Sequence, residues 1–248
     1  MRRLLFAAVL LLPLALAGRV AAATPAVPTG CPGVEVPPLP LPALAARVSA
    51  GQPVRVVAFG SSSTAGAGAS SPERTYPHRL QVELSAHWPG VKVEVLNRGV
   101  GGEDVIEMLE RLERDVLLAR PALVIWQLGV NAALRRQDVQ DFRLRLHEGL
   151  ARMRAAGAEV VLMDSQMGPW ARNAPQRAAF DAALAEAAAT WEGVELFSRA
   201  RIMAGWAARG AAPEVMLAAD GLHHNDRGYA CLAEALARAI RDGTGEPR

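Results

Sequence analysis

A run of hydroxyl side chains stands where an apolar stretch ends, and it could supply a nucleophile. Residues 54–59 read VRVVAF, and the next residues read GSSSTAG, which contains Ser61, Ser62 and Ser63. A serine is a weak nucleophile until a positioned base accepts its proton, and histidine is the usual base. The chemistry to look for is therefore acyl transfer, and the chain must also provide a histidine.

Two of the five histidines stand beside a carboxylate, in the segment DGLHHN at 220–225. Asp220 lies three residues before His223, close enough for the carboxylate to bond one imidazole nitrogen and leave the other free. The pair could be a base with its orienting group. The plainer alternative is that Asp220 is a loop carboxylate that caps a helix. The other three histidines fall in polar helical patterns, where we expect surface side chains: His78, His87 and His147.

Attack on an acyl carbon also needs hydrogen-bond donors for the oxyanion that develops. Gly101 and Gly102 follow Val100 and permit close approach of the backbone, and Asn131 in LGVN offers a side-chain amide. Each has a plainer interpretation, because the glycines could form a strand-to-helix turn and Asn131 could cap a helix.

Strand-like and helix-like segments alternate along the chain, and their arrangement would bring these residues together. Apolar runs of strand length occur at 54–59, 91–96, 122–128, 159–163 and 194–197. Helical patterns occur at about 74–87, 103–119, 137–156, 175–191 and 226–241. This alternation predicts a parallel sheet with helices on both faces. Function in such sheets lies at the carboxyl ends of the strands. The serine run, the glycines at 101–102, LGVN and DGLHHN should therefore gather at this edge.

The four segments resemble, in order, the four blocks of the SGNH (GDSL-type) serine esterases. GSSSTAG resembles the Gly-Asp-Ser loop, NRGVGGE resembles NxGxxGD, LGVN resembles Gly-x-Asn, and DGLHHNDRGY resembles DGLHPNxxGY. The blocks span residues 59–229. The resemblance implies a flavodoxin-like three-layer α/β/α sandwich with a five-stranded parallel sheet.

The same resemblance implies the role of each site residue. Ser62 would be the nucleophile, His223 the base and Asp220 its orienting group, with no cofactor. Gly102, Asn131 and the Ser62 amide would form the oxyanion hole.

The chain departs from the family pattern at Ser61, where the family usually carries an aspartate that supports the loop. Variants with serine there resemble carbohydrate esterases of the superfamily. Neighbouring side chains on extended backbone point to opposite sides. We therefore expect Ser61 to turn inward and Ser63 or Thr64 to cap the following turn.

Two other kinds of site are less well supported. The G-x-S-x-G motif of α/β-hydrolases would need glycine at position 64, where the chain has Thr64. A metal site could draw on four side chains by type alone: Asp220, His223, His224 and Asp226. No cluster of cysteine or glutamate supports it, so we expect no metal.

The N-terminal region is typical of an exported protein. MRR precedes an apolar run and AAA at 21–23, which predicts a signal peptide over 1–23 and a periplasmic or secreted protein. A membrane anchor is the alternative, but the apolar run of about 14 residues is shorter than the roughly 20 that span a bilayer. We expect a proline-rich tether over 24–53, with a short helix at 42–50, and a hydrolase domain over 54–248.

The two cysteines, Cys31 and Cys231, are expected to form a disulfide in an oxidising compartment, although two unrelated thiols are the alternative. Such a bond would fix the proline-rich segment to the last helix.

The expected substrate is an ester, most simply an O-acetyl group on a carbohydrate. The segment MDSQMGPWARN at 163–173 should overhang the site, with Trp170 and Arg172 as candidate substrate contacts, although a tryptophan packed in the core is the alternative. Acyl transfer, lipid or lysophospholipid esters and a non-catalytic polysaccharide-binding module remain alternatives. A net charge of +2 without clustered basic residues gives no case for nucleic-acid binding, and the sequence does not indicate an oligomeric state.

Overall fold

The computed structural model describes residues 30–245, except the side chains of residues 171 and 172. The predicted signal peptide at 1–23 lies outside the described residues. Five strands form one sheet in which every neighbouring pair is parallel, in the order β2-β1-β3-β4-β5. They are β1 Val54–Gly60, β2 Val93–Gly99, β3 Leu123–Gln127, β4 Glu159–Met163 and β5 Val194–Phe197.

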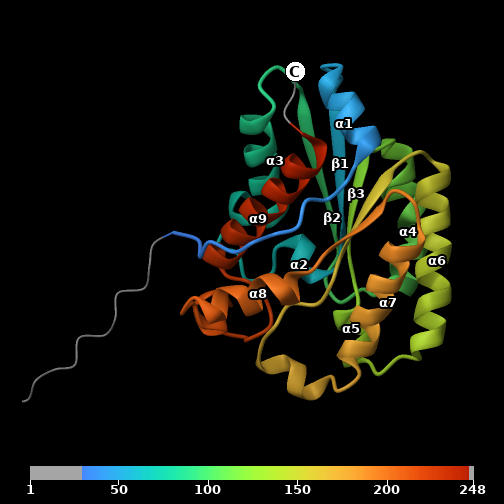
Figure 1. The fold of residues 1–248 in the computed structure, drawn as a ribbon. Helices are drawn as coiled ribbons and strands as arrows, with labels where there is room; N and C mark the ends of the chain where they lie inside the picture. Colours follow the sequence, from blue (N-terminus) through green and yellow to red (C-terminus); the bar gives the residue numbers. More distant parts are fainter. Residues whose placement is uncertain (1–29, 246–248) are drawn as a thin grey trace, which may run out of the picture.

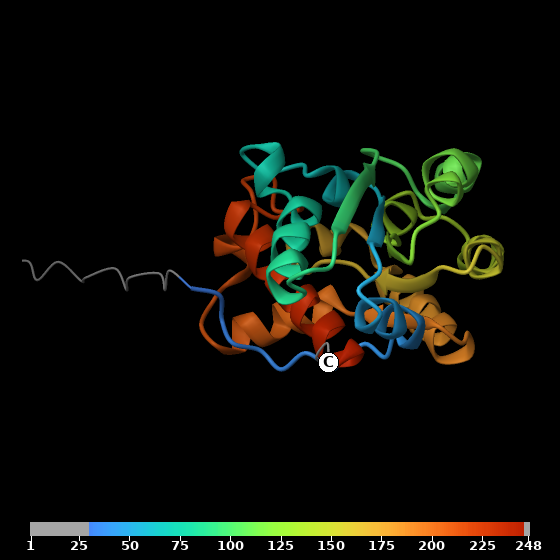
Figure 2. The same ribbon diagram turned by 90° about the horizontal axis from the view of Figure 1, so that it is seen from above.

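Helices cover both faces of this sheet (Figures 1 and 2). One side carries α1 Pro42–Ser49, α3 Tyr76–His87, α8 Arg199–Ala208 and α9 Asp226–Thr244, and the other carries α4 Val105–Asp115, α6 Val139–Ala155 and α7 Arg177–Thr190. Two short helices, α2 Ser62–Ala65 and α5 Val130–Leu134, follow the ends of β1 and β3. The strand order is that of flavodoxin-like folds, so the predicted fold class is confirmed.

The apolar runs became strands because both of their faces are buried. In β1, Val56 and Ala58 join the core beneath α3 and α9, whereas Val57 and Phe59 join the core beneath α4 and α6. Alternate side chains of a strand point to opposite faces, so a strand covered on both sides must be apolar throughout.

The short helices α2 and α5 were not predicted, and three longer elements also differ from the sequence expectation. Strand β2 extends to Gly99, beyond the predicted end at residue 96, because its polar residues Asn97 and Arg98 still pair with β1. These side chains are exposed at the sheet edge, so an apolar pattern could not reveal them. Helix α8 was not predicted, and the predicted helix at 103–119 ends at Asp115 before a separate 3₁₀ turn.

The proline-rich segment is extended up to Leu41 and then forms α1, close to the predicted helix. It is not a free tether, because Leu39 and Leu41 are buried in the core beneath α9. The backbone amide of Leu39 donates to the Ala239 carbonyl at 2.9 Å. The amides of Ala43 and Leu44, at the start of α1, donate to the buried Glu159 carboxylate at 3.1 and 2.8 Å.

The disulfide between Cys31 and Cys231 confirms the predicted pairing. Their Cα atoms lie 5.3 Å apart, and the bond joins the start of the N-terminal segment to α9. Figure 1 shows this segment running beside α9 before it reaches α1. In the part of the chain that the structure describes, no helix is both long and apolar enough to cross a membrane.

Candidate active site

The structure separates the three consecutive serines by the direction of their side chains. Ser61 is 4% exposed, and its backbone amide and hydroxyl both donate to Oε1 of Gln127, at 3.0 and 3.1 Å. Ser62 is the first residue of α2 and is partly exposed. Its Oγ lies 2.7 Å from Nε2 of His223. Ser61 therefore faces inward, as expected, and Ser62 faces the histidine.

The turn after the serines is closed by a glycine rather than by a hydroxyl cap. Gly66 ends α2 in the left-handed conformation with φ +103°, which costs glycine least. Thr64 does not cap the turn as expected. Its hydroxyl is fully buried, donates to Gln127 Oε1 at 3.2 Å and lies 3.1 Å from the Tyr76 hydroxyl. Ser63 is also buried, so neither side chain competes with Ser62 for the histidine.

Asp220 orients His223 through three contacts. Oδ1 accepts the backbone amides of Leu222 and His223, each at 2.9 Å, and Oδ2 lies 2.6 Å from Nδ1 of His223. Partial burial opposes ionisation of Asp220, but the hydrogen bonds from His223 and Leu222 outweigh it and keep the pKa of this carboxyl below its ordinary value. An ionised carboxylate can only accept, so Nδ1 carries the proton and Nε2 is left to accept from Ser62.

The loop that carries this pair is fixed from beneath by His224. His224 is fully buried, its Nδ1 contacts the Met216 carbonyl at 3.2 Å, and its backbone pairs with Leu217. Burial lowers the pKa of His224 to about 3, so this imidazole is neutral at physiological pH. Asp226 lies at the start of α9 and accepts the amide and hydroxyl of Ser70, at 2.8 and 2.6 Å. These contacts join the loop of Asp220 and His223 to the segment that follows α2.

The four residues of the alternative metal site do not point toward one common position, because each has its own partner. His224 points into the core and Asp226 binds Ser70, away from the pair that faces Ser62. Among the described residues, no three His, Cys, Asp or Glu side chains are grouped so that they could hold a metal ion.

The expected oxyanion donors follow the ends of three strands: Ser62 begins α2, Gly102 lies in the loop after β2, and Asn131 lies in α5. A Cβ built on Gly101 would lie 3.9 Å from the Cβ of Ser62. Gly102 is exposed with φ +83°, and its carbonyl accepts from Arg135 at 2.6 Å, which fixes the peptide that follows it. Nδ2 of Asn131 donates to the Glu103 carbonyl at 2.7 Å.

Asn131 is not the cap of α5, because Gly129 occupies that position. Its side chain connects α5 to the loop after β2, and a second N–H on the same nitrogen remains for a ligand. The helix-cap interpretation of Asn131 is therefore wrong, whereas its role as an oxyanion donor stays a prediction.

The segment 163–173 packs against the loop that contains Asp220 and His223, but its tryptophan does not face open solvent. Nε2 of Gln166 donates to the Leu222 carbonyl at 2.9 Å. Trp170 is 7% exposed and packs into the core on the α4, α6 and α7 side, so it offers little surface to a substrate. Trp170 is thus a core residue, contrary to the expectation, and the side chain of Arg172 lies outside what the structure describes.

Sequence reasoning missed two buried residues that support the site, Gln127 and Arg111. Gln127 accepts from both Ser61 and Thr64, and Arg111 donates to the Gly60 carbonyl at 3.1 Å. A signal for Arg111 was present, because it falls between Met108 and Leu112 on the apolar stripe of α4. A charged residue on a buried stripe needs partners, so it was a candidate for a structural or functional contact.

Known proteins resemble this chain over most of its length. The model of the Non-GDSL lipase-like family matches residues 31–246. A lipase/acylhydrolase from Enterococcus faecalis is 24% identical, with a TM-score of 0.67 over 79% of this chain and 98% of its own. An acetyl xylan esterase, AlAXEase, is 20% identical, with a TM-score of 0.66 over 76% of this chain and 100% of its own.

A two-domain esterase active on acetylated mannans is 23% identical, with a TM-score of 0.64 over 83% of this chain and 54% of its own. At these identities the structures establish the shared fold. A search among curated proteins found no match. The family match covers most of the chain and agrees with the resemblance to SGNH (GDSL-type) esterases, so this chain belongs to the Non-GDSL lipase-like family and is a carboxylic ester hydrolase.

Proposed function

We propose that this protein is an exported serine esterase that removes O-acetyl groups from a carbohydrate through an acyl-enzyme intermediate. The observation that carries the proposal is the chain of contacts from Ser62 Oγ to His223 Nε2 at 2.7 Å and from His223 Nδ1 to Asp220 Oδ2 at 2.6 Å. A nucleophile, a base and an orienting carboxylate within hydrogen-bond reach form the arrangement needed for acyl transfer.

The first half of the reaction forms the acyl-enzyme. His223 Nε2 accepts the hydroxyl proton while Ser62 Oγ attacks the ester carbonyl carbon. The oxyanion is held by the amides of Gly102 and Ser62 and by Nδ2 of Asn131. Protonated His223 then gives its proton to the alkoxide of the sugar as the C–O bond breaks.

The second half regenerates the enzyme. Water replaces the sugar, loses a proton to His223 Nε2 and attacks the acyl carbonyl carbon. The proton returns to Ser62 Oγ as this atom leaves, and acetate is released. Asp220 stays ionised throughout and stabilises the imidazolium ion that forms twice in the cycle.

A cavity lies at the C-terminal end of α2, and its lining does not include Ser62, Asp220 or His223. Its volume is about 540 Å³, and its lining includes Ala65, Gly66, Ser71, Gln81 and Asn97. The amide oxygens of Gln81 and Asn97 already accept from Val95 and Gly99, so their nitrogens are left as donors. These donors and the Ser71 hydroxyl suit a hydroxyl-rich part of a substrate, whereas Ala69, Pro72 and Val95 give the same cavity an apolar side. Two of the similar structures are esterases named for acetylated xylan or mannan.

Export is supported by the signal-peptide pattern of the first 23 residues together with the disulfide between Cys31 and Cys231. Structural disulfides persist in oxidising compartments and are rare in the cytosol. Fractionation of cells that express the full chain, followed by N-terminal sequencing, tests the proposal. We expect a mature protein that begins near residue 24, and an uncleaved cytosolic product would contradict export.

The function is tested with p-nitrophenyl esters of increasing acyl length and with an acetylated xylan, using Ser62→Ala as the matched control. We expect the highest kcat/KM for the acetyl ester, release of acetate from the polysaccharide, and no measurable turnover by the variant. Preference for long acyl chains would instead identify a lipid esterase. Polysaccharide binding without turnover would identify a binding module, and acetylated sugar acceptors in place of free acetate would identify a transferase.

A further inference from the structure

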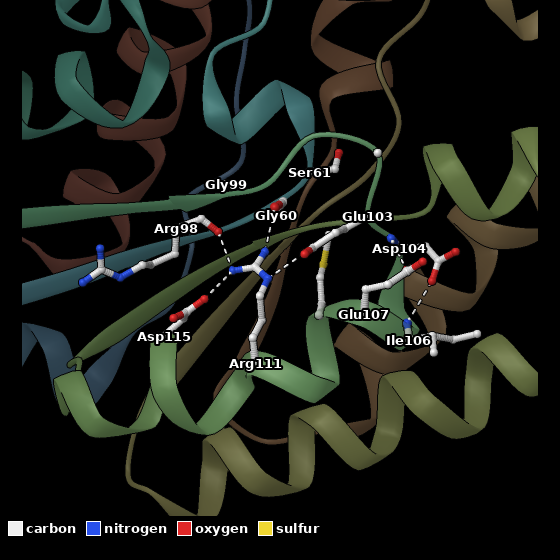
Figure 3. A network of polar contacts seen from close by, with 12 residues as sticks. Gly60, Ser61, Arg98, Gly99, Glu103, Asp104, Ile106, Glu107, Arg111 and Asp115 are labelled. Carbon is white, nitrogen blue, oxygen red and sulfur yellow. Dashed lines mark hydrogen bonds and ion pairs between the residues drawn. The ribbon is translucent and has the colours of Figure 1, made fainter.

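A buried arginine on α4 joins the loop that carries the nucleophile to the loop that carries Gly102 (Figure 3). The Arg111 side chain is only 6% exposed. Its Nη2 donates to the Gly60 carbonyl at 3.1 Å, and its Nε donates to Glu103 Oε2 at 2.6 Å. Gly60 lies two residues before Ser62, and Glu103 directly follows Gly102, so one guanidinium contacts both loops.

The third guanidinium nitrogen of Arg111 also has partners in the protein. Nη1 donates to the Arg98 carbonyl at 2.9 Å and to Asp115 Oδ2 at 3.0 Å, and the guanidinium carbon lies 4.5 Å from the centre of the Phe59 ring. All three guanidinium nitrogens are thus engaged by β1, β2, the following loop and α4. A rigid planar fork with several donors can hold such partners at fixed separations, which a lysine cannot.

Glu103 connects this arginine to the expected oxyanion donors. Its carboxylate accepts from Arg111, while its backbone carbonyl accepts from Asn131 Nδ2 at 2.7 Å. The loop is also fixed after Glu103, where Asp104 caps α4 by accepting the amide of Ile106 at 2.9 Å (Figure 3). The position of Glu103 therefore sets where Gly102 and Asn131 lie relative to Ser62.

We propose that Arg111 and Glu103 are positioning residues that hold the oxyanion hole in register with the nucleophile. The inference rests on the proposed function, in which Gly102 and Asn131 stabilise the oxyanion. Neither residue touches the substrate. Arg111 contacts Gly60 on the nucleophile side and Glu103 on the oxyanion side. Loss of either residue of the pair therefore shifts the oxyanion donors, which contribute more in the transition state than in the ground state.

The test measures kcat and KM for p-nitrophenyl acetate in Arg111→Met and Glu103→Gln, with Arg114→Met as the matched control. Arg114 pairs with the same Asp115 at 2.8 Å but is exposed and does not contact either loop. A displacement of about 1 Å can cost about 10²-fold in rate. We expect roughly this loss of kcat in Arg111→Met, a smaller loss in Glu103→Gln, an unchanged KM in both, and an unchanged kcat in the control.

A double-mutant cycle distinguishes positioning from general support of the fold. Because Glu103 holds Asn131 as well as Gly102, adding Glu103→Gln to Asn131→Ala should lower kcat by less than the product of the two single effects, whereas independent effects would multiply. Circular dichroism and thermal melting report folding. If Arg111→Met does not fold, Glu103→Gln decides, because glutamine keeps the size of glutamate but removes the charge that pairs with Arg111.

Three results would overturn the inference. A folded Glu103→Gln protein with wild-type kcat, or effects that multiply in the cycle, would show that the pair does not position the hole while leaving the proposed function intact. A wild-type kcat in Asn131→Ala would remove Asn131 from the proposed function itself, and the positioning role with it.

Discussion

Removal of the Cys31–Cys231 disulfide should lower stability substantially, because the bond closes a very long loop. The two cysteines are 200 residues apart in the sequence. In the chain-entropy model, a cross-link over a loop of this length removes entropy from the unfolded chain worth about 5 kcal/mol at 25 °C. In a protein of this size each kcal/mol corresponds to about 2–4 °C. The melting temperature should therefore fall by about 10–20 °C.

The assay compares the oxidised protein with Cys31→Ser and with the double variant Cys31→Ser/Cys231→Ala. Cys231 is 2% exposed and Cys31 is partly exposed, so Cys31→Ser disturbs the core least. Urea unfolding followed by circular dichroism gives both the midpoint and the slope. The unfolded variant is a more open chain, so the slope should increase while the midpoint falls.

The reasoning would be refuted if oxidised protein and Cys31→Ser unfolded at the same urea concentration. That result would mean that the docked segment alone fixes the N-terminal region, through the buried Leu39 and Leu41 and the Leu39–Ala239 hydrogen bond. A fall in the midpoint without a change in slope would also contradict the entropic account, because the unfolded chains would then be equally open.

Further predictions concern the site. Ser62→Ala should lose about 10⁴-fold or more in kcat while remaining folded, and a fluorophosphonate should label a single peptide at Ser62. A label on Ser61 instead would show that Ser62 is not the nucleophile. Asn131→Ala should lower kcat by roughly 10²–10³ with KM unchanged, and a normal kcat would exclude it as a donor. The pKa of His224 is lowered from 6.5 to about 3, so below pH 6.5 the unfolded chain binds a proton that the native protein excludes. As the pH decreases below 6.5, the free energy of unfolding therefore decreases by about 1.4 kcal/mol per pH unit. Urea unfolding at pH 7 and at pH 4.5 should show this loss in wild type relative to His224→Phe.

The fold and the residues around Ser62 could be predicted because their signals are local. Strands buried on both faces must be largely apolar, and β1, β3, β4 and β5 each carry only a single charged or amide side chain. Once the strands are parallel, their carboxyl ends share an edge, so segments far apart in the sequence must meet there. Asp220 and His223 are three residues apart, which is enough to predict that they can bond.

The parts that could not be predicted depend on contacts between distant segments. Arg111 has the partners Gly60, Arg98 and Glu103, of which two contribute backbone carbonyls that any residue would supply. Trp170 was expected above the site because its loop follows β4, but burial of its large apolar ring in the core decided its position. A tryptophan in a loop carries no sequence mark that distinguishes these two outcomes.

At position 61 this chain has serine where the GDSL pattern has aspartate, and Gln127 at the end of β3 explains the difference. The backbone amide of Ser61 needs an acceptor inside the protein, and this fixes Gln127 with Oε1 toward the loop, at 3.0 Å. The same oxygen then accepts the hydroxyls of Ser61 and Thr64 at 3.1 and 3.2 Å. An aspartate at 61 would place a carboxylate against an oxygen that cannot donate, in a position that is 4% exposed, and a buried charge without a donor is costly. With Gln127 in this orientation, the neutral hydroxyl of Ser61 supports the loop without burying a charge.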